Sequence, residues 1–344
     1  MNGDGAVKDV WMKLFVMALV ALTIVVIARA VIRNGQELVL IHALTGERLL
    51  LIAWQVMALL AAATFVWRVY LAMAYRPAAI VRSNKKLPTV AVIVPAYNEG
   101  RQVLDTLRSI AKSNYPVDKM TIIAIDDGSK DDTWSWMLMA AKELGKRVEL
   151  IRQDRNLGKR HALYAGIRRS KAQVIVTIDS DSEVDRDTLR SIVSPFVHNP
   201  QVGGVAGNVR VLNRNEGVIP RMLDVAFCYS FDFMRAGESH INTVMCTPGA
   251  LSAYRTSAVL PVLDEWLNQK FMGRPANIGE DRAFTNLILR QGYYVHYQST
   301  ALVWTKLPTH YSGLRRMLLR WPGPTSGRPS PSAVSLSPTS GKAP

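Results

Sequence analysis

The stretch VAVIVPAYNE at residues 90–99 opens with apolar, mostly β-branched residues and closes with polar ones. TIIAIDDGS at 121–129 and VIVTIDSD at 174–181 repeat this arrangement, and segments of helical spacing at 100–113 and 131–144 lie between them. Near-continuous apolar runs of this length are typical of strands buried on both faces. Their alternation with helices predicts an α/β domain with a doubly wound, mostly parallel sheet, which binds its ligand at the carboxyl ends of the strands.

Acidic residues follow all three predicted strands: Glu99 after the first, Asp126 and Asp127 after the second, and Asp179 and Asp181 after the third. Solvated loops and helix caps account for some acidic residues at such places. They do not account for Asp179 and Asp181, because a spacing of two at a strand end directs both carboxylates to one face. Like charges held together cost free energy unless a cation lies between them. These two residues therefore predict a site for Mg²⁺ or Mn²⁺ shared with a diphosphate.

A basic segment, NLGKRH at 156–161, precedes a helix predicted to begin near Ala162. A glycine followed by two cations at a helix N-terminus suits an anion, and a plain surface turn fits the same residues equally well. The sequence contains no GxxxxGK[ST], no GxGxxG after a strand, no HExxH and no GxSxG. The segment is kept as a candidate anion site.

The composition bounds the class of protein. The chain has 344 residues, 49% of them hydrophobic and 20% charged, and its 42 Lys plus Arg against 27 Asp plus Glu leave a net charge of +15. This excludes a disordered or fibrous protein. The basic residues are scattered, without an aromatic-interleaved stripe or zinc spacing, so we predict no nucleic-acid partner and attribute the charge to anionic lipid and a phosphate-bearing substrate. Cys228 and Cys246 are too few for a disulfide framework, which favours a cytosolic catalytic part.

Two apolar runs, at residues 14–32 and 49–67, are each about 19 residues long, enough to cross a bilayer as a helix. Basic residues follow the second run at positions 68, 76, 82, 85 and 86. Since basic residues concentrate on the cytosolic side, we predict a hairpin with both ends in the cytosol, in a multi-pass protein of the cell (inner) membrane with the lipid bilayer as a partner. A cleaved signal peptide followed by a core helix is the alternative, but residues 1–9 have mixed charge.

Six short motifs occur in order along the chain: VPAYNE at 94–99, DDGS at 126–129, GKR at 158–160, DSD at 179–181, GEDR at 279–282 and RW at 320–321. In these motifs the sequence resembles family 2 glycosyltransferases of the GT-A fold, and in particular the processive membrane synthases of hyaluronan, rhizobial chitin oligosaccharides and cellulose. FMG at 271–273 ahead of GEDRAFT at 279–285 is most similar to the hyaluronan and chitin-oligosaccharide branch. That branch usually has His-Leu in place of Ala283-Phe284.

The resemblance implies a nucleotide-sugar site made of Tyr97, Glu99, Asp126, Asp127, Lys159 and Asp179. Tyr97 and Asp127 would hold the uracil ring, by stacking and by a hydrogen bond from its imide N–H, and Asp126 would support their loop. Asp179 would contact the ribose or the metal, and Asp181 would ligate the metal. Lys159 would add a second positive charge beside the leaving diphosphate.

The resemblance also implies the residues that act on the acceptor. Asp281 would be the catalytic base that takes the proton of the acceptor hydroxyl, and Glu280 beside it would keep a carboxyl basic through its like charge. Without the resemblance, these two residues would be interpreted as an exposed helix N-terminus. Arg320 and Trp321 match the end of the family's Gln-x-x-Arg-Trp motif, whose Trp stacks on the acceptor sugar, and Met317 stands where the family has Gln.

These inferences predict a cytosolic N-terminus (1–12), two transmembrane helices (13–75), a basic linker (76–87), a GT-A glycosyltransferase domain (88–321) and a disordered Pro/Ser-rich tail (322–344). The resembled synthases have further membrane spans where this chain has the tail. We therefore expect either a short, non-exporting relative or a truncated or shifted reading frame near Trp321.

The predicted function is transfer of a sugar, with inversion, from a UDP-sugar to a β-linked glycan at the cytosolic membrane face, as in polysaccharide synthases. N-acetylglucosamine is the predicted sugar, and Mg²⁺ or Mn²⁺ the predicted cofactor. Two alternatives stay open. One is a truncated membrane fragment that binds a UDP-sugar with weak or no turnover, and the other is a non-processive transferase that acts on a lipid-linked acceptor.

Overall fold

The computed structural model describes residues 25, 29, 46–271, 274–275 and 279–320. Contacts divide the chain into two units. The first comprises the described residues up to Arg76 together with Tyr229–Asn242, and the second comprises Pro77–Cys228 and the described residues from Thr243 onward. The domain boundaries given above stay predictions.

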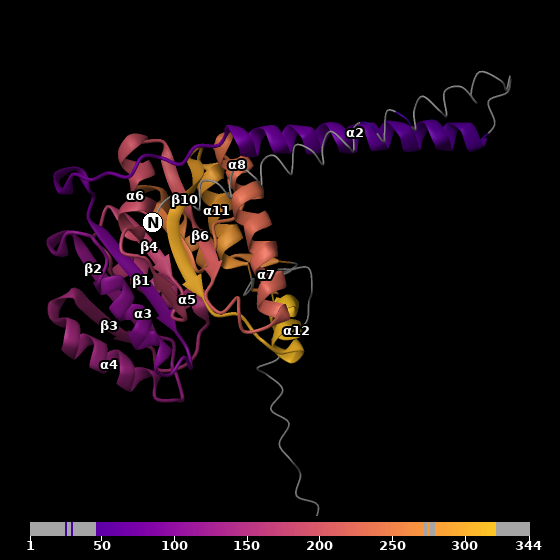
Figure 1. Ribbon diagram of the computed structural model, residues 1–344. Helices are drawn as coiled ribbons and strands as arrows, with labels where there is room; N and C mark the ends of the chain where they lie inside the picture. Colours follow the sequence, from indigo (N-terminus) through magenta and orange to yellow (C-terminus); the bar gives the residue numbers. More distant parts are fainter. Residues whose placement is uncertain (1–24, 26–28, 30–45, 272–273, 276–278, 321–344) are drawn as a thin grey trace, which may run out of the picture. The chain divides into compact units, whose positions relative to one another are not determined.

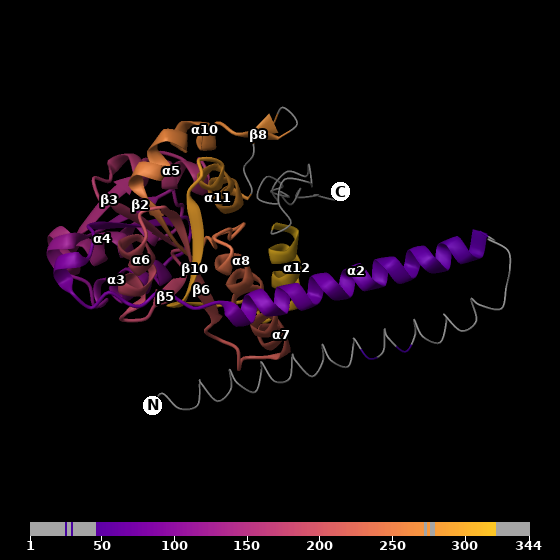
Figure 2. The ribbon, with the colours of Figure 1, turned by 90° about the horizontal axis from the view of Figure 1, so that it is seen from above.

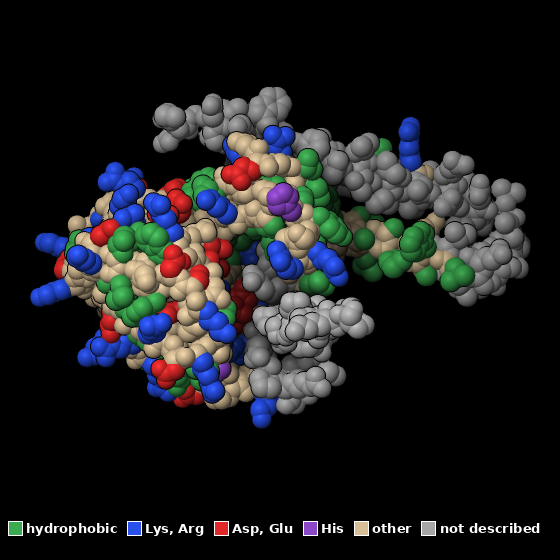
Figure 3. Space-filling model, turned by 90° about the horizontal axis from the view of Figure 1, so that it is seen from below, with side chains coloured by type: hydrophobic (Ala, Val, Ile, Leu, Met, Phe, Trp, Pro, Cys, Tyr) green, Lys and Arg blue, Asp and Glu red, His purple; other side chains and the backbone are tan. Residues whose placement is uncertain are grey.

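The described part of the first unit is built on one long helix, α2 (Gly46–Ala74). Its segment Ile52–Ala74 has 23 residues with a mean hydropathy of 1.8 and is long and apolar enough to cross a membrane. Figure 3 shows hydrophobic side chains along its exposed surface. The second predicted span lies within α2, whereas the first, at 14–32, falls outside the described residues except for Val25 and Arg29. The described residues thus contain one candidate span, and the two-span hairpin stays a prediction.

The same unit contains a π-helix, η4 (Tyr229–Arg235), followed by α8 (Ala236–His240). Both contact α2: Arg68 Nη1 donates to Met234 Sδ over 3.4 Å, and the Tyr70 and His240 rings meet edge to face. Phe231 of η4 is buried.

The second unit contains an eight-stranded sheet of order β3-β2-β1-β4-β7-β6-β10-β5 (Figure 1). Its strands are β1 (Val90–Ala96), β2 (Met120–Asp126), β3 (Val148–Arg152), β4 (Val174–Ile178), β5 (Ser182–Val184), β6 (Val202–Val211), β7 (Leu251–Arg255) and β10 (Tyr294–Thr305). β3, β2, β1 and β4 are parallel, as predicted, but β7 runs antiparallel to both β4 and β6, and β5 antiparallel to β10. The α/β class is therefore confirmed, and the sheet is mixed.

Helices cover both faces of this sheet. The described helices of this unit are α3 (Gln102–Ala111), α4 (Thr133–Leu144), α5 (Lys159–Arg169), α6 (Thr188–His198), α7 (Val218–Cys228), α9 (Thr256–Val259), α10 (Leu263–Leu267), α11 (Glu280–Arg290) and α12 (Tyr311–Arg320). Short 3₁₀ turns are η1 (Asn84–Lys86), η2 (Val117–Lys119), η3 (Gly145–Arg147) and η5 (Leu260–Val262), and β8 (Lys270–Phe271) pairs with β9 (Arg274–Pro275). Figure 2 shows α5, α10 and α11 on one side of the sheet, and α3, α4 and α6 on the other.

The three apolar runs recognised in the sequence form the centre of the core, because β1, β2 and β4 are covered on both faces. Ile93, Ile122 and Ile175 are among the fully buried side chains. Burial of such aliphatic side chains stabilises the fold by about 1.5–3 kcal/mol each. The same burial brings three polar strand ends to one edge of the sheet.

The helix starts differ from the predicted ones. α3 and α4 each begin two residues after the start of the predicted segments at 100–113 and 131–144. At α4, Asp131 Oδ1 accepts a hydrogen bond from Thr133 N over 3.1 Å, which satisfies one of the free N–H groups of the first turn. The helix predicted to begin near Ala162 begins three residues earlier, at Lys159. The prediction was wrong because Gly158 already accepts from His161 N and Ala162 N, so Lys159 and Arg160 belong to the first turn of α5.

Candidate active site

The first two acidic strand ends meet directly. β1 and β2 are parallel with Ala96 in register with Asp126, and Asp127 N donates to Ala96 O over 2.9 Å. Tyr97 follows β1 and is 38% exposed, so its ring is available to a ligand. β4 flanks β1 on its other side, which brings Asp179 to the same edge. Parallel pairing of three strands thus places these residues together, as expected for strand-end sites.

Asp126 and Asp127 shape the loop that follows β2. Asp126 is fully buried, and its Oδ1 accepts from Ser129 N over 3.0 Å. The Asp127 oxygens accept from Leu157 N over 2.8 Å and Gly158 N over 2.9 Å, which ties this loop to the start of α5. Burial raises the pKa of Asp127, partly offset by these two backbone bonds. Each carboxylate oxygen has a second lone pair that can accept from a ligand.

An open pocket of about 640 Å³ lies beside this loop, within the range of ligand sites. It is lined by Tyr97, Gly128, Ser129, Lys130, Arg152, Gln153, Asp154, Arg155 and Asn156. Gly128 has φ +69°, and a Cβ there would lie 2.5 Å from the backbone carbonyl carbon of Arg155, so a side chain is excluded. Lys130, Arg152 and Arg155 give the pocket a basic wall suited to a nucleotide. Sequence reasoning missed these three, although Arg152 ends β3, the neighbouring parallel strand.

The third strand end, Asp179-Ser180-Asp181, is a cluster of negative charge. Burial, and then the charge of Asp179, raise the pKa of Asp181. Glu99 faces the same cluster: burial and the charges of Asp181 and Asp179 raise its pKa to about 7. Among the residues that the structure describes, no three His, Cys, Asp or Glu side chains form a ready metal site. Two close carboxylates with hard oxygen donors nevertheless fit Mg²⁺ or Mn²⁺ if a ligand supplies further oxygens.

Helix α3 holds the backbone of this turn through three polar side chains on one face. Thr106 Oγ1 donates to Ser180 O over 2.8 Å, and Gln102 Nε2 donates to Asp181 O over 3.1 Å. One turn further along, Ser109 Oγ accepts from Val184 N over 3.3 Å. Because the side chains at i, i+4 and i+7 share a helix face, α3 fixes the turn at two points and the following strand β5 at a third. Sequence reasoning missed this set, since only the fold shows which face of α3 meets the turn.

Thr106→Val tests this anchoring. Valine has nearly the same shape, so the change removes the hydrogen bond to Ser180 O at a position that is 1% exposed. We expect the metal-dependent affinity for UDP to fall about 10-fold, since residues that orient metal ligands contribute 10- to 100-fold. Calorimetry with UDP and Mn²⁺ measures this, with Thr121→Val, at the exposed second position of β2, as the matched control. Equal affinities for both variants would contradict the assignment.

Lys159 lies at the centre of the site. Its Nζ hydrogen-bonds Asp179 Oδ1 and lies 3.7 Å from Glu280 Oε1. Burial alone lowers the pKa of Lys159, but the charges of Asp179 and Glu280 outweigh it and hold the pKa above its ordinary value. The ammonium group therefore stays charged and joins the end of β4 to the start of α11.

Gly249 makes room for this contact. A Cβ at Gly249 would lie 2.7 Å from Lys159 Nζ and 3.5 Å from Asp179 Oδ2. Any side chain there would push the ammonium group off the Asp179 carboxylate. The turn before β7 thus approaches the ion pair with bare backbone, and the sequence offered no signal for this role.

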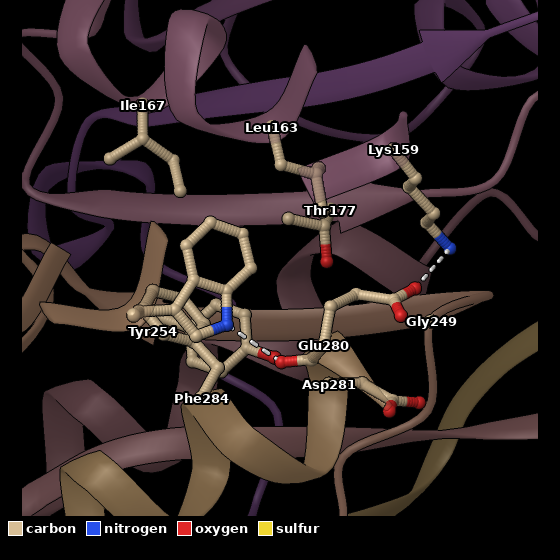
Figure 4. A pocket seen from close by; sticks show the side chains of 10 residues that line it. Lys159, Leu163, Ile167, Thr177, Gly249, Tyr254, Glu280, Asp281 and Phe284 are labelled. Atoms are coloured by element: carbon tan, nitrogen blue, oxygen red, sulfur yellow. Dashed lines mark hydrogen bonds and ion pairs between the residues drawn. The ribbon is translucent and has the colours of Figure 1, made fainter. Parts of the chain in front are cut away.

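Asp281 lies in the first turn of α11, next to Glu280. In Figure 4 the Glu280 carboxylate points toward the Lys159 amine, and the Asp281 carboxylate points away from that pair. Burial, and then the charge of Glu280, raise the pKa of Asp281, whose Oδ1 accepts from Arg282 N over 2.8 Å. The cavity behind Glu280 is about 20 Å³, room for one water molecule, so a sugar has to bind elsewhere.

The predicted acceptor residues lie at the edge of what the structure describes. Arg320 is the last residue of α12, and its side chain is outside the described part. Trp321 and the predicted tail at 322–344 also fall outside the described residues. Their roles stay predictions.

Comparison with known proteins identifies the class that this fold and site define. The sequence model of the family described as "Glycosyltransferase like family 2" matches residues 88–323. An N-acetylglucosaminyltransferase of Azorhizobium caulinodans is 34% identical over 235 residues, and one of Rhizobium meliloti is 33% identical over 239 residues. The chain therefore belongs to glycosyltransferase family 2 and is a glycosyltransferase.

These alignments cover only part of this chain and only part of each relative. The two alignments cover 68% and 69% of this chain, and 59% and 56% of the relatives. The chain thus spans less than three fifths of the length of the curated relatives it matches. What the relatives do as whole proteins is therefore a proposal for this chain.

A solved structure supports the GT-A-like fold. The mannosyltransferase PcManGT from Pyrobaculum calidifontis, in complex with GDP-Man and Mn²⁺, aligns with a TM-score of 0.58 at 25% identity. The alignment covers 75% of this chain and 70% of that one. The resemblance stated from the six motifs is confirmed, and the prediction of an enzyme with it.

Proposed function

We propose that this chain transfers N-acetylglucosamine from its UDP derivative to a β-linked glycan, with inversion, at the cytosolic face of a membrane. One observation supports this above all: Lys159 joins Asp179, at the end of β4, to Glu280, at the start of α11. This contact unites a candidate diphosphate site with a candidate base, Asp281. The sugar follows the names of the rhizobial relatives.

The donor nucleotide would occupy the open pocket beside the loop after β2. The Tyr97 ring would stack on uracil, and Asp127 would accept from the imide N–H. Arg152 and Arg155 would face the phosphates or the base from the opposite wall. Glu99 lies close to the carboxylates of the third strand end. Within the predicted nucleotide-sugar site, we therefore place it beside the diphosphate.

Asp181 and Asp179 would hold a divalent cation together with the donor diphosphate. When bound, Mg²⁺ or Mn²⁺ supplies positive charge that stabilises the leaving diphosphate. Lys159 supplies a fixed positive charge at the same place, held charged by its two carboxylate neighbours. The chain's own part is to keep these groups oriented before the donor binds, which lowers the barrier without reorganisation.

Asp281 would act as the base. Its carboxylate takes the proton from the acceptor hydroxyl as that oxygen attacks the anomeric carbon of the donor. The bond from this carbon to the diphosphate oxygen breaks, and its electron pair leaves with UDP. Attack from the face opposite the leaving group inverts the configuration. Burial and the neighbouring Glu280 charge raise the pKa of Asp281, which makes the carboxylate a stronger base.

The acceptor sugar would stack on Trp321, next to Arg320, as the family motif implies. The membrane placement rests on α2, whose apolar surface is exposed, and on the basic residues that follow it. On the face in Figure 3, Lys and Arg side chains are dispersed over the surface. This distribution suits general attraction to an anionic bilayer.

A donor panel tests the proposal. Inverted and right-side-out membrane vesicles that contain the full chain are given radiolabelled UDP-GlcNAc, UDP-glucose, UDP-glucuronate or GDP-mannose, with a chito-oligosaccharide acceptor. We expect label in the glycan only from UDP-GlcNAc and only in inverted vesicles. Equal use of GDP-mannose would refute the donor, and equal activity in right-side-out vesicles would refute the cytosolic site.

A further inference from the structure

A buried Trp is attached to the start of α11 at two points. Trp266, at the end of α10, is 1% exposed, and its Nε1 donates to Glu280 O over 2.8 Å. Its indole also packs on the Phe284 ring, with centroids 4.7 Å apart, one turn further along α11. Asp281 lies between these two points. The Trp266 ring thus contacts α11 at residues on both sides of Asp281.

Arg160 in turn holds Trp266. It is 5% exposed, Nη1 donates to Trp266 O over 2.5 Å, and the guanidinium lies 5.1 Å from the centroid of the indole ring. Its Nε and Nη2 are buried and have no hydrogen-bond partner among the described residues. Burial lowers the pKa of Arg160, opposed by the charge of Glu280.

A buried cation with two unused donors is a poor stabiliser, because its desolvation cost is only partly recovered. Neither a phosphate role nor fold stability explains Arg160 well. Its neighbour Lys159, in the same first turn of α5, binds Asp179 and approaches Glu280. Two adjacent residues of α5 therefore reach the start of α11 by separate routes, one through an ion pair and one through the indole.

We infer that Arg160 and Trp266 are positioning residues for Asp281, which they hold at the reacting centre without touching substrate themselves. This inference rests on the proposed role of Asp281 as the base. Small displacements of a reacting group cost up to about 100-fold in rate, so loss of this support should reduce turnover more than binding.

Trp266→Phe keeps an aromatic ring against Phe284 and removes the Nε1 donor. In the full chain in lipid nanodiscs, we expect kcat to fall about 10-fold or more, with KM for the donor, calorimetric UDP affinity and melting temperature close to wild type. The matched control is Trp136→Phe on α4, which removes a comparable indole bond to Asp132 far from α11. An unchanged kcat, or a loss matched by falls in UDP affinity and melting temperature, would overturn the inference.

Arg160→Met provides a second, independent test of the positioning role. It removes the buried charge while filling much of its volume, so we expect the melting temperature to stay at or above wild type while kcat falls. A purely structural Arg160 would show the reverse, a lower melting temperature with unchanged kcat. Asp281→Asn distinguishes failure of the proposed base from failure of the positioning role. A normal rate in Asp281→Asn refutes the proposed base. A reduced rate in Asp281→Asn together with a normal rate in Trp266→Phe refutes only the positioning role.

Discussion

Asp281→Asn is expected to lower kcat by about 10²- to 10⁴-fold, the contribution typical of a positioned general base. The amide has nearly the same shape as the carboxylate and can still accept from Arg282 N, but it cannot take a proton. UDP binding should be almost unchanged, because the donor pocket lies at the ends of β1, β2 and β3. Steady-state transfer from UDP-GlcNAc and calorimetry with UDP measure the two effects.

Two comparisons sharpen this test. Asp118→Asn, on the exposed turn η2, is the matched control and should behave as wild type. Glu280→Gln removes the charge that, after burial, raises the pKa of Asp281. Since the base acts deprotonated, the rate falls as pH drops through its pKa, and this acid limb should move to lower pH in Glu280→Gln. A normal rate for Asp281→Asn, or an unmoved limb, would contradict the assignment.

Asp181→Ala is expected to abolish the metal dependence of UDP binding. Wild type should bind UDP at least about 10²-fold more tightly with Mn²⁺ or Mg²⁺ than with chelator. A residue that binds the metal directly should have a larger effect than residues that only orient metal ligands, which contribute about 10- to 100-fold. In the variant, the two affinities should converge on the weaker value. The physical reason is that Asp179 alone, already paired with Lys159, offers the cation too little negative charge.

Calorimetric titration of UDP at saturating metal and in EDTA measures this metal dependence in the wild type and in Asp181→Ala. Asp118→Ala serves as the control for loss of a carboxylate remote from the site. If wild type binds UDP equally well with and without metal, or if Asp181→Ala retains the difference, the metal site has to be abandoned. Neither result would affect the assignment of Asp281, which concerns the acceptor proton.

Much of the fold could be predicted from local patterns. The strand predicted at residues 174–178 matches β4, and those predicted from Val90 and Thr121 match β1 and β2 to within a residue or two. These strands can be recognised in the sequence because both of their faces are buried, so nearly every position is apolar. β3 was not predicted, since VELIR at 148–152 is short, carries two charged residues and lies half-buried at the border of the sheet, so it lacks the continuous apolar run of the central strands. With it, the basic wall of the nucleotide pocket was missed.

The sheet direction was only half predicted. Short alternating segments indicate parallel pairing, which holds for β3, β2, β1 and β4. β7 breaks the parallel pairing, because it lies between β4 and β6 and runs antiparallel to both. It follows β6 in the chain only after about 40 residues, so no short connection indicates this pairing. No local signal encodes the neighbour of a strand, because pairing is decided by which hydrophobic faces pack together.

The sequence by itself determined the chemistry: acidic strand ends, a lysine after glycine, and a carboxylate pair at a helix start are legible as motifs because their spacing is local. Tertiary structure decided which of these groups meet. Lys159 reaches Glu280 across 121 positions only because α5 and α11 cover the same sheet face. Arg160, which looked like a second anion contact, turns instead onto Trp266. Such partners are set by packing over long chain separations, where the loss of chain entropy is recovered only by the complete core.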